Sequence, residues 1–290
     1  MFRRILWHVN RTPAAKAIKA ARRATARSEL AERRALGQTL ARSPESEAVV
    51  ANLRRDGYSR VDALLEAESL AALDGATGKF GGKAGDKSVF GGNKDIWRHL
   101  IDADMVDGCL PADSPFARFA LQEPLLAALA DYYGELPRLD YVTVTYSGPV
   151  AGELRFSQLW HRDHDDTRVV KLFVYLTDVS DDEDGPFTFL PGPESDKVGF
   201  SRHSHRPDSE VGAKADLGKA VHMTGPRLSA FLVETSRCLH MGSRVAAGHE
   251  RVMYTATFIS SPRIFPERPK PFFRLAGSES AVERRVLLAG

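Results

Sequence analysis

The sequence predicts a mainly β protein with flanking helices, organised around one large domain. From Asp140 onward, short segments rich in Val, Phe, Tyr and Thr alternate with turn residues, a pattern typical of a sandwich or barrel. Before that point, the chain is rich in Ala, Arg, Leu and Glu, which favours helices. A length of 290 residues with 43% hydrophobic content is enough to bury a sizeable core.

The first half of the chain is expected to supply the helices. Residues 13–55 have a helical composition, and Ser43-Pro44 is expected to break this stretch and cap a second helix. The further expected elements are a strand at 58–61, a helix at 66–76, an exposed Gly- and Lys-rich loop at 75–94 and a helix near 114–133.

The second half is expected to supply the sheets. Tyr141–Tyr146 alternates Val with aromatic residues or Thr, as a strand with two different faces would. Residues 193–219 have little pattern, so we expect an insertion or a lid near the functional site. The expected strands are 141–146, 154–163, 169–179, 220–223, 229–234, 237–241 and 252–260.

The positive charge of the chain gathers at its start. Residues 1–34 hold ten Lys and Arg against Glu29 and Glu32, a local charge of +8 in a chain of +2 overall. We expect a solvated helix that packs on the domain. A weak membrane-surface contact and a cleaved organellar presequence are the alternatives. The apolar side of such a membrane helix would be Phe2, Ile5, Leu6 and Val9.

Composition also limits location and partners. Cys109 and Cys238 are the only cysteines and have no metal or redox spacing, which favours a reducing compartment. We therefore expect a cytoplasmic protein, or a mitochondrial one if the basic start is a presequence. The acidic body lacks an aromatic and basic face, so nucleic acid is not an expected partner. The expected division is a basic extension at 1–45, a catalytic domain at 46–265 and a tail at 266–290.

Three residues form a candidate metal site. His161 and Asp163 are two positions apart, so on a strand both side chains point to one face. With His240 from another strand they would form the two-histidine, one-carboxylate set of non-haem Fe(II) oxygenases. Zinc is the alternative metal. Arg251 follows eleven residues after His240 and offers a fixed guanidinium for a carboxylate.

The surroundings of these residues resemble a known family. The sequence resembles the phytanoyl-CoA dioxygenase family of Fe(II)- and 2-oxoglutarate-dependent oxygenases from about Val50 to Ile259. It departs where the family usually has Pro-Gly-Ser-His and this chain has Pro191-Gly192-Pro193-Glu194, a position that is not a metal ligand. The motifs that carry the resemblance are Trp160-His161-Arg162-Asp163, Gly185-Pro186, Cys238-Leu239-His240-Met241-Gly242 and Arg251.

The resemblance implies a double-stranded β-helix, a cupin-like jelly roll, with Fe(II) as cofactor and 2-oxoglutarate and O2 as co-substrates. It implies that Arg251 holds the distal carboxylate of 2-oxoglutarate, with Arg244 as a rival. Lys171 is a second candidate contact, because it lies on one face of its strand with Phe173 and Tyr175.

Three further residues flank the metal motifs and are candidates for the substrate pocket: Trp160, Tyr146 and Gln158. Packing in the core is the alternative for the two aromatic residues. Two other patterns are not expected to bind metals. The histidines at 203, 205 and 222 lack an acidic ligand at a fixed spacing, and the acidic turn at 178–185 lacks the twelve-residue calcium pattern.

The expected activity is therefore an oxidation that releases succinate and CO2. A small molecule or a lipid-like acyl compound would be hydroxylated. The carboxylate of Asp163 argues against halogenation, because halogenating relatives have a small residue there. The alternatives are a non-catalytic jelly-roll binding module and a zinc- or manganese-dependent cupin-type isomerase or hydrolase.

Overall fold

A computed structural model describes residue 12 and residues 14–78, 98–149, 152–199, 203–242, 244–265 and 271–288. Its centre is an antiparallel six-stranded sheet with the strand order β1-β8-β5-β10-β4-β2. The strands of this major sheet are β1 (Tyr58–Arg60), β2 (Arg98–His99), β4 (Arg138–Ser147), β5 (Val169–Tyr175), β8 (Ala230–Glu234) and β10 (Arg251–Ile259).

A smaller sheet faces one side of the major sheet. It consists of β7 (Val221–Met223), β6 (Phe187–Phe189) and β9 (His240–Met241), paired in that order. Phe173 of the major sheet packs on Phe187 of the minor sheet, with ring centroids 4.3 Å apart. The two sheets and the helices around them form the expected jelly roll, so the predicted fold class is confirmed.

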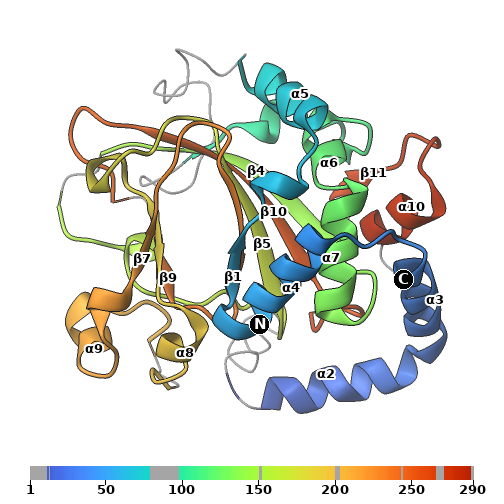
Figure 1. Cartoon of the computed structure of the whole chain (residues 1–290), viewed down its shortest axis with the longest axis horizontal. Helices are drawn as coiled ribbons and strands as arrows, with labels where there is room; N and C mark the ends of the chain where they lie inside the picture. Colours follow the sequence, from blue (N-terminus) through green and yellow to red (C-terminus); the bar gives the residue numbers. More distant parts are fainter. Residues whose placement is uncertain are drawn as a thin grey trace.

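Helices cover the opposite side of the major sheet. In Figure 1, α4 (Pro44–Asp56) and α7 (Glu123–Tyr133) lie on this side, whereas β7, β9, α8 (Gly192–Ser195) and α9 (Asp208–Gly212) lie on the other. Side chains alternate accordingly, because Leu172 and Val174 of β5 join the helix-covered core whereas Phe173 and Tyr175 face the minor sheet. The helices on this side are α3 (Arg27–Gln38), α4 (Pro44–Asp56), α5 (Ala67–Thr77), α6 (Pro115–Phe119), α7 (Glu123–Tyr133) and α10 (Ala281–Leu287).

Local sequence signals explain the helix boundaries. Ser43 caps α4 through a capping box with Ser46, and Pro44 begins the helix. Gly57 ends it with φ +80, a left-handed conformation that glycine adopts without strain. The expected break at Ser43-Pro44 is therefore found. An additional break at Ala26, with φ −101 and ψ 31, separates α2 (Ala14–Thr25) from α3.

The expected strand at 154–163 is wrong. A 3-10 turn occupies Phe156–Gln158, and Trp160 and His161 then form only isolated antiparallel bridges. The reason is that Trp160 pairs with Arg206 and His161 pairs with His240, so no single partner strand continues the ladder. The expected strand at 169–179 likewise ends at Tyr175, because the chain then turns away from the sheet.

The two ends of the described chain pack on its body. Leu287 of α10 is buried, and Arg33 of α3 donates a hydrogen bond to the carbonyl of Leu288. β11 (Phe273–Arg274) pairs in parallel with β3 (Leu110–Pro111). The expected membrane face at residues 2–9 and most of the expected loop at 75–94 lie outside the described residues.

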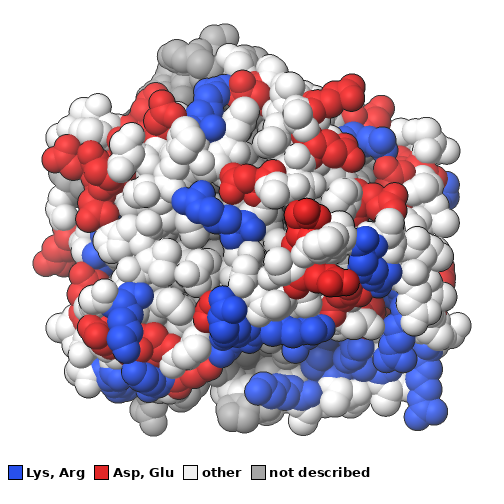
Figure 2. Space-filling view, viewed as in Figure 1, with Lys and Arg blue, Asp and Glu red and all other residues white. Residues whose placement is uncertain are grey.

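The basic start of the chain forms part of the surface. Figure 2 shows Lys and Arg side chains along the lower edge of the molecule, where Figure 1 places α2, whereas acidic side chains predominate higher up. None of the helices in the described part of the chain has the length and apolarity that a membrane crossing needs.

Candidate metal centre

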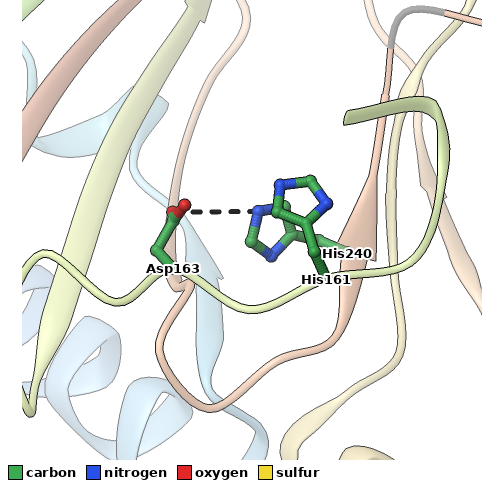
Figure 3. A group of neighbouring side chains, drawn as sticks. All are labelled: His161, Asp163 and His240. Atoms are coloured by element: carbon green, nitrogen blue, oxygen red, sulfur yellow. Dashed lines mark ion pairs between the residues drawn. The ribbon is translucent and has the colours of Figure 1, made fainter. Parts of the chain in front are cut away.

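The two histidines are brought together by backbone pairing. His161 and His240 exchange two backbone hydrogen bonds of 2.9 Å, so their rings lie next to each other with centroids 4.2 Å apart. Asp163 follows on the same loop, and its backbone N–H donates to the carbonyl of Thr235 at 3.0 Å. In Figure 3 its carboxylate faces the two rings, and its Oδ2 lies 3.7 Å from Nε2 of His240.

The ligand atoms of these three residues all lie within 4.8 Å of one another. Within the described residues, this is the one group of His, Cys, Asp and Glu side chains that gathers closely enough to hold a metal ion. Two imidazole nitrogens and one carboxylate are the donor set typical of non-haem iron. The sequence spacing thus identified residues that the fold does bring together, although His161 and Asp163 lie on a loop rather than on a strand.

The protonation states suit metal binding. Nδ1 of His161 lies 2.9 Å from the carbonyl of Leu159, and Nδ1 of His240 lies 3.0 Å from the carbonyl of Cys238. A carbonyl can only accept a hydrogen bond, so each Nδ1 carries the proton and each Nε2 keeps its lone pair for a metal.

Burial adds to this effect, because it lowers the pKa of His161 to about 3 and also lowers the pKa of His240. Burial alone would raise the pKa of Asp163, but the ammonium of Lys171 beside it holds that pKa well below its usual range. The site therefore holds two neutral imidazoles and one carboxylate, as metal ligation requires.

Lys171 contacts the metal carboxylate. It projects from β5 on the side of Phe173, as the sequence predicts, and its Nζ lies 2.8 Å from Oδ2 of Asp163. The ammonium also lies 5.9 Å from the ring centroid of Tyr141. Burial alone would lower the pKa of Lys171, but Asp163 and Tyr141 raise it above its usual value, so the side chain stays charged.

Arg251 lies at the first position of β10, opposite Ser147 of β4. Only 2% of it is exposed, and its guanidinium donates to the carbonyl of Gly185 and to Oγ of Ser147. The rival Arg244 instead forms an ion pair with Asp208 at 2.7 Å.

A cavity of about 660 Å³ joins the metal ligands to Arg251. Ser204 and His205 line it from the segment expected to form a lid, and the ring of His205 lies 5.0 Å from that of His161. The walls combine polar and apolar groups. Among the lining residues are Ile101, Tyr141, Thr143, Thr145, His164, Asp165, Lys171, Phe173, Phe187, Met241, Met253, Thr255 and Phe272.

The three substrate candidates of the sequence analysis lie elsewhere. Trp160 is buried among apolar residues that include Val198 and Val211 of the segment 193–219, and its Nε1 donates to Asp208 at 2.9 Å. Tyr146 packs against the helix-covered core, and Oε1 of Gln158 accepts a hydrogen bond from the backbone of Arg155. Within the described chain, none of the three is among the residues that line the cavity.

Sequence reasoning missed several polar cavity residues, among them Tyr141, His164, Asp165 and His205. The alternation along β4 was a usable signal for one of them, because it places Tyr141 on the face opposite Tyr146. Of the other histidines, His222 pairs with Asp182 at 2.5 Å and does not join a metal group in the described chain. The acidic turn at 178–185 is closed by Asp184, which pairs with His249 at 2.8 Å.

Comparison with known proteins agrees with this geometry. The sequence model of the phytanoyl-CoA dioxygenase family matches residues 53–252, more than half of the chain. The chain belongs to the phytanoyl-CoA dioxygenase family. The expected resemblance is thereby confirmed, and the group of His161, Asp163 and His240 has the donor set that the expected Fe(II) site needs. No curated protein matches the chain by sequence.

Several solved structures share the fold at low sequence identity. EctD from S. alaskensis with 2-oxoglutarate and 5-hydroxyectoine is 18% identical, with a TM-score of 0.56 over 83% of this chain and 86% of that one. The epimerase SnoN in complex with Fe3+, alpha ketoglutarate and nogalamycin RO is 19% identical, with a TM-score of 0.51 over 74% and 84%. AviO1 from Streptomyces viridochromogenes Tue57 is 17% identical, with a TM-score of 0.51 over 77% and 97%.

Proposed function

We propose that this member of the phytanoyl-CoA dioxygenase family hydroxylates a small molecule and releases succinate and CO2. The observation that carries the proposal is the cluster of two neutral imidazoles and one carboxylate, whose ligand atoms lie within 4.8 Å of one another beside a cavity. Three protein ligands leave positions for a chelating co-substrate and for oxygen. When bound, iron and 2-oxoglutarate supply the oxidising chemistry.

The residues of the chain hold and orient the reactants. Nε2 of His161, Nε2 of His240 and the carboxylate of Asp163 are the proposed metal ligands. Arg251, buried at the start of β10 and part of the same cavity wall, is the proposed anchor for the distal carboxylate of 2-oxoglutarate. Lys171 keeps its charge within reach of both Asp163 and the cavity, which suits a second contact to the co-substrate.

The surroundings support a small-molecule substrate. The cavity of about 660 Å³ has the size of an ordinary small-molecule site. Structural relatives were crystallised with 5-hydroxyectoine and nogalamycin RO, both small molecules. All proposed roles fall within the expected catalytic domain at 46–265. A cytoplasmic location is part of the proposal, because Cys109 and Cys238 are free thiols.

The first test measures iron and succinate together. The wild type should bind one Fe(II) per chain and form succinate from 2-oxoglutarate. His161→Ala and His240→Ala should lose both properties, because each removes one of three protein ligands. His222→Ala is the matched control, since His222 is exposed and pairs with Asp182. Normal succinate formation by His240→Ala would refute the triad, and product masses would distinguish hydroxylation from another oxidation.

The second test locates the co-substrate anchor. Truncation of one partner of a buried charged pair costs about 2–5 kcal/mol, so Arg251→Ala should raise the 2-oxoglutarate requirement by about 30-fold or more. Arg251→Lys should recover part of the loss, because an ammonium lacks the planar fork of donors. Arg244→Ala, the control, should change the titration much less. A larger effect of Arg244→Ala would show that Arg244, and not Arg251, binds the distal carboxylate of 2-oxoglutarate.

A further inference from the structure

Asp165 is a carboxylate of the cavity wall that forms no ion pair with any of the residues the structure describes. It lies two residues after Asp163, between that ligand and strand β5. Among the described residues, its one hydrogen bond comes from Oη of Tyr141, at a long 3.5 Å. A carboxylate can accept about four hydrogen bonds, and Asp165 lines the cavity, where a ligand can donate to it.

The neighbouring carboxylates differ from Asp165 in this respect. Each of them has a basic side chain within ion-pair distance, whereas no ion pair of Asp165 occurs in the part of the chain that the structure describes. Lys171 and Arg263 act on the Asp165 carboxylate only from beyond ion-pair distance. A carboxylate held in a partly dry wall is stabilised by a cation in direct contact, and a ligand in the cavity can supply one. The neighbouring pairs are Lys171–Asp163 at 2.8 Å, Arg263–Asp140 at 3.2 Å and Lys19–Asp166 at 2.8 Å.

Aromatic rings lie next to this carboxylate. Tyr141 reaches Asp165 through its hydroxyl, and its ring centroid lies 6.3 Å from that of Phe272. Both residues line the cavity. The faces of aromatic rings attract ammonium groups, and the attraction grows when the cation is desolvated. Carboxylate and rings therefore favour the same kind of ligand.

We propose that Asp165, Tyr141 and Phe272 form a subsite for a cationic nitrogen group, so that the substrate is a small amine and not a fatty-acyl thioester. This inference rests on the proposed oxygenase function. A fatty-acyl chain would leave the carboxylate of Asp165 desolvated and unpartnered, which is costly. An ammonium group at this subsite places a neighbouring part of the amine beside the metal ligands.

The experiment uses the full chain loaded with Fe(II) and 2-oxoglutarate under nitrogen, and follows the visible absorption of the iron site. The probes are butylammonium, the neutral butanol and the anionic butyrate. Butylammonium should change the spectrum saturably and bind at least about tenfold more tightly than the other two, a difference of about 1.4 kcal/mol. Asp165→Asn should remove this preference, whereas Asp113→Asn, the same change at an exposed acid, should keep it.

A second variant guards against a folding defect in Asp165→Asn. Phe272→Leu removes one aromatic face and keeps the carboxylate, so it should weaken butylammonium binding severalfold and leave butanol binding unaltered. If the wild type forms no iron spectrum with 2-oxoglutarate, the proposed function itself is wrong. If the spectrum forms but butanol binds as tightly as butylammonium, or Asp165→Asn keeps the preference, the oxygenase stands and the amine subsite is overturned.

Discussion

Two aspartates on one loop, Asp163 and Asp166, each pair with a lysine from another element, and the two pairs serve different ends. Lys19 of α2 pairs with Asp166, and Lys171 of β5 pairs with Asp163, in both cases at 2.8 Å. The loop that holds them runs from the metal ligands to β5. Because the ion-pair distances are equal, they do not show which pair is structural. The other hydrogen-bond partners of each side chain show it.

The hydrogen-bonding capacity of the pair of Lys19 and Asp166 is filled by protein atoms. Besides Asp166, the ammonium donates to the carbonyls of Ser260 at 3.0 Å and Pro262 at 2.5 Å. Asp166 also accepts hydrogen bonds from the backbone of Thr167 at 2.7 Å and of Ile264 at 2.9 Å. Burial is tolerable because nearly every polar atom has a partner. This pair joins α2, the end of β10 and the metal-binding loop.

The pair of Lys171 and Asp163 is open to exchange. Both side chains line the cavity, and Asp163 also faces His240, whose Nε2 has a lone pair. A metal ion can share the carboxylate with Lys171 or replace the ammonium as its partner. The two pairs differ in where their partners come from. A charged side chain whose partners are all protein atoms has a structural role, whereas one that faces a cavity can bind a partner from solution.

The largest expected effect is on the pair of Lys19 and Asp166. Lys19→Met should lower the free energy of unfolding by about 3–5 kcal/mol, because Asp166 stays buried without its cation. Urea unfolding followed by circular dichroism measures the loss. A loss of less than about 1 kcal/mol would show that this pair, too, is exchangeable with solvent.

A smaller effect is expected at the open pair. Lys171→Met should lower the stability of the metal-free protein by about 1–2 kcal/mol, because the cavity lets water reach Asp163. Binding of Co(II) should raise the unfolding midpoint more in this variant than in the wild type, since no ammonium competes for the carboxylate. Equal stabilisation by Co(II) in both proteins would contradict the exchange.

The third expected effect depends on pH and concerns His161, the histidine next to the open pair. The folded pKa of His161 is about 3, below the usual value of about 6.5, so the folded site stays neutral while the unfolded chain takes up a proton. Stability of the metal-free protein should fall as the pH drops from about 6.5 toward 3, by at most about 1.4 kcal/mol per unit from this group. Above that window the contribution is complete. Urea midpoints across this range should fall less steeply for His161→Asn, and an unchanged slope would rule out the neutral buried ring.

Local sequence patterns determined much of the site. The i, i+2 spacing identified His161 and Asp163, and strand alternation placed Lys171 on the cavity side, because the period of a strand is fixed by its backbone. The cap at Ser43 was readable for the same reason, since it depends on residues three positions apart. The ligand types themselves limited the chemistry to a metal site with open positions.

Contacts between residues far apart in the sequence determined the other features of the site. Trp160 is turned away from the cavity because its backbone pairs with Arg206, 46 positions later, and no local pattern encodes that partner. Lys19 reaches Asp166 across 147 positions, so a basic helix outside the family-matched region supports the metal loop. Asp165 differs from its acidic neighbours in having no ion pair within the described residues. The sequence shows the carboxylate, but the tertiary structure alone decides which charges are neutralised, because neutralisation depends on distance in space.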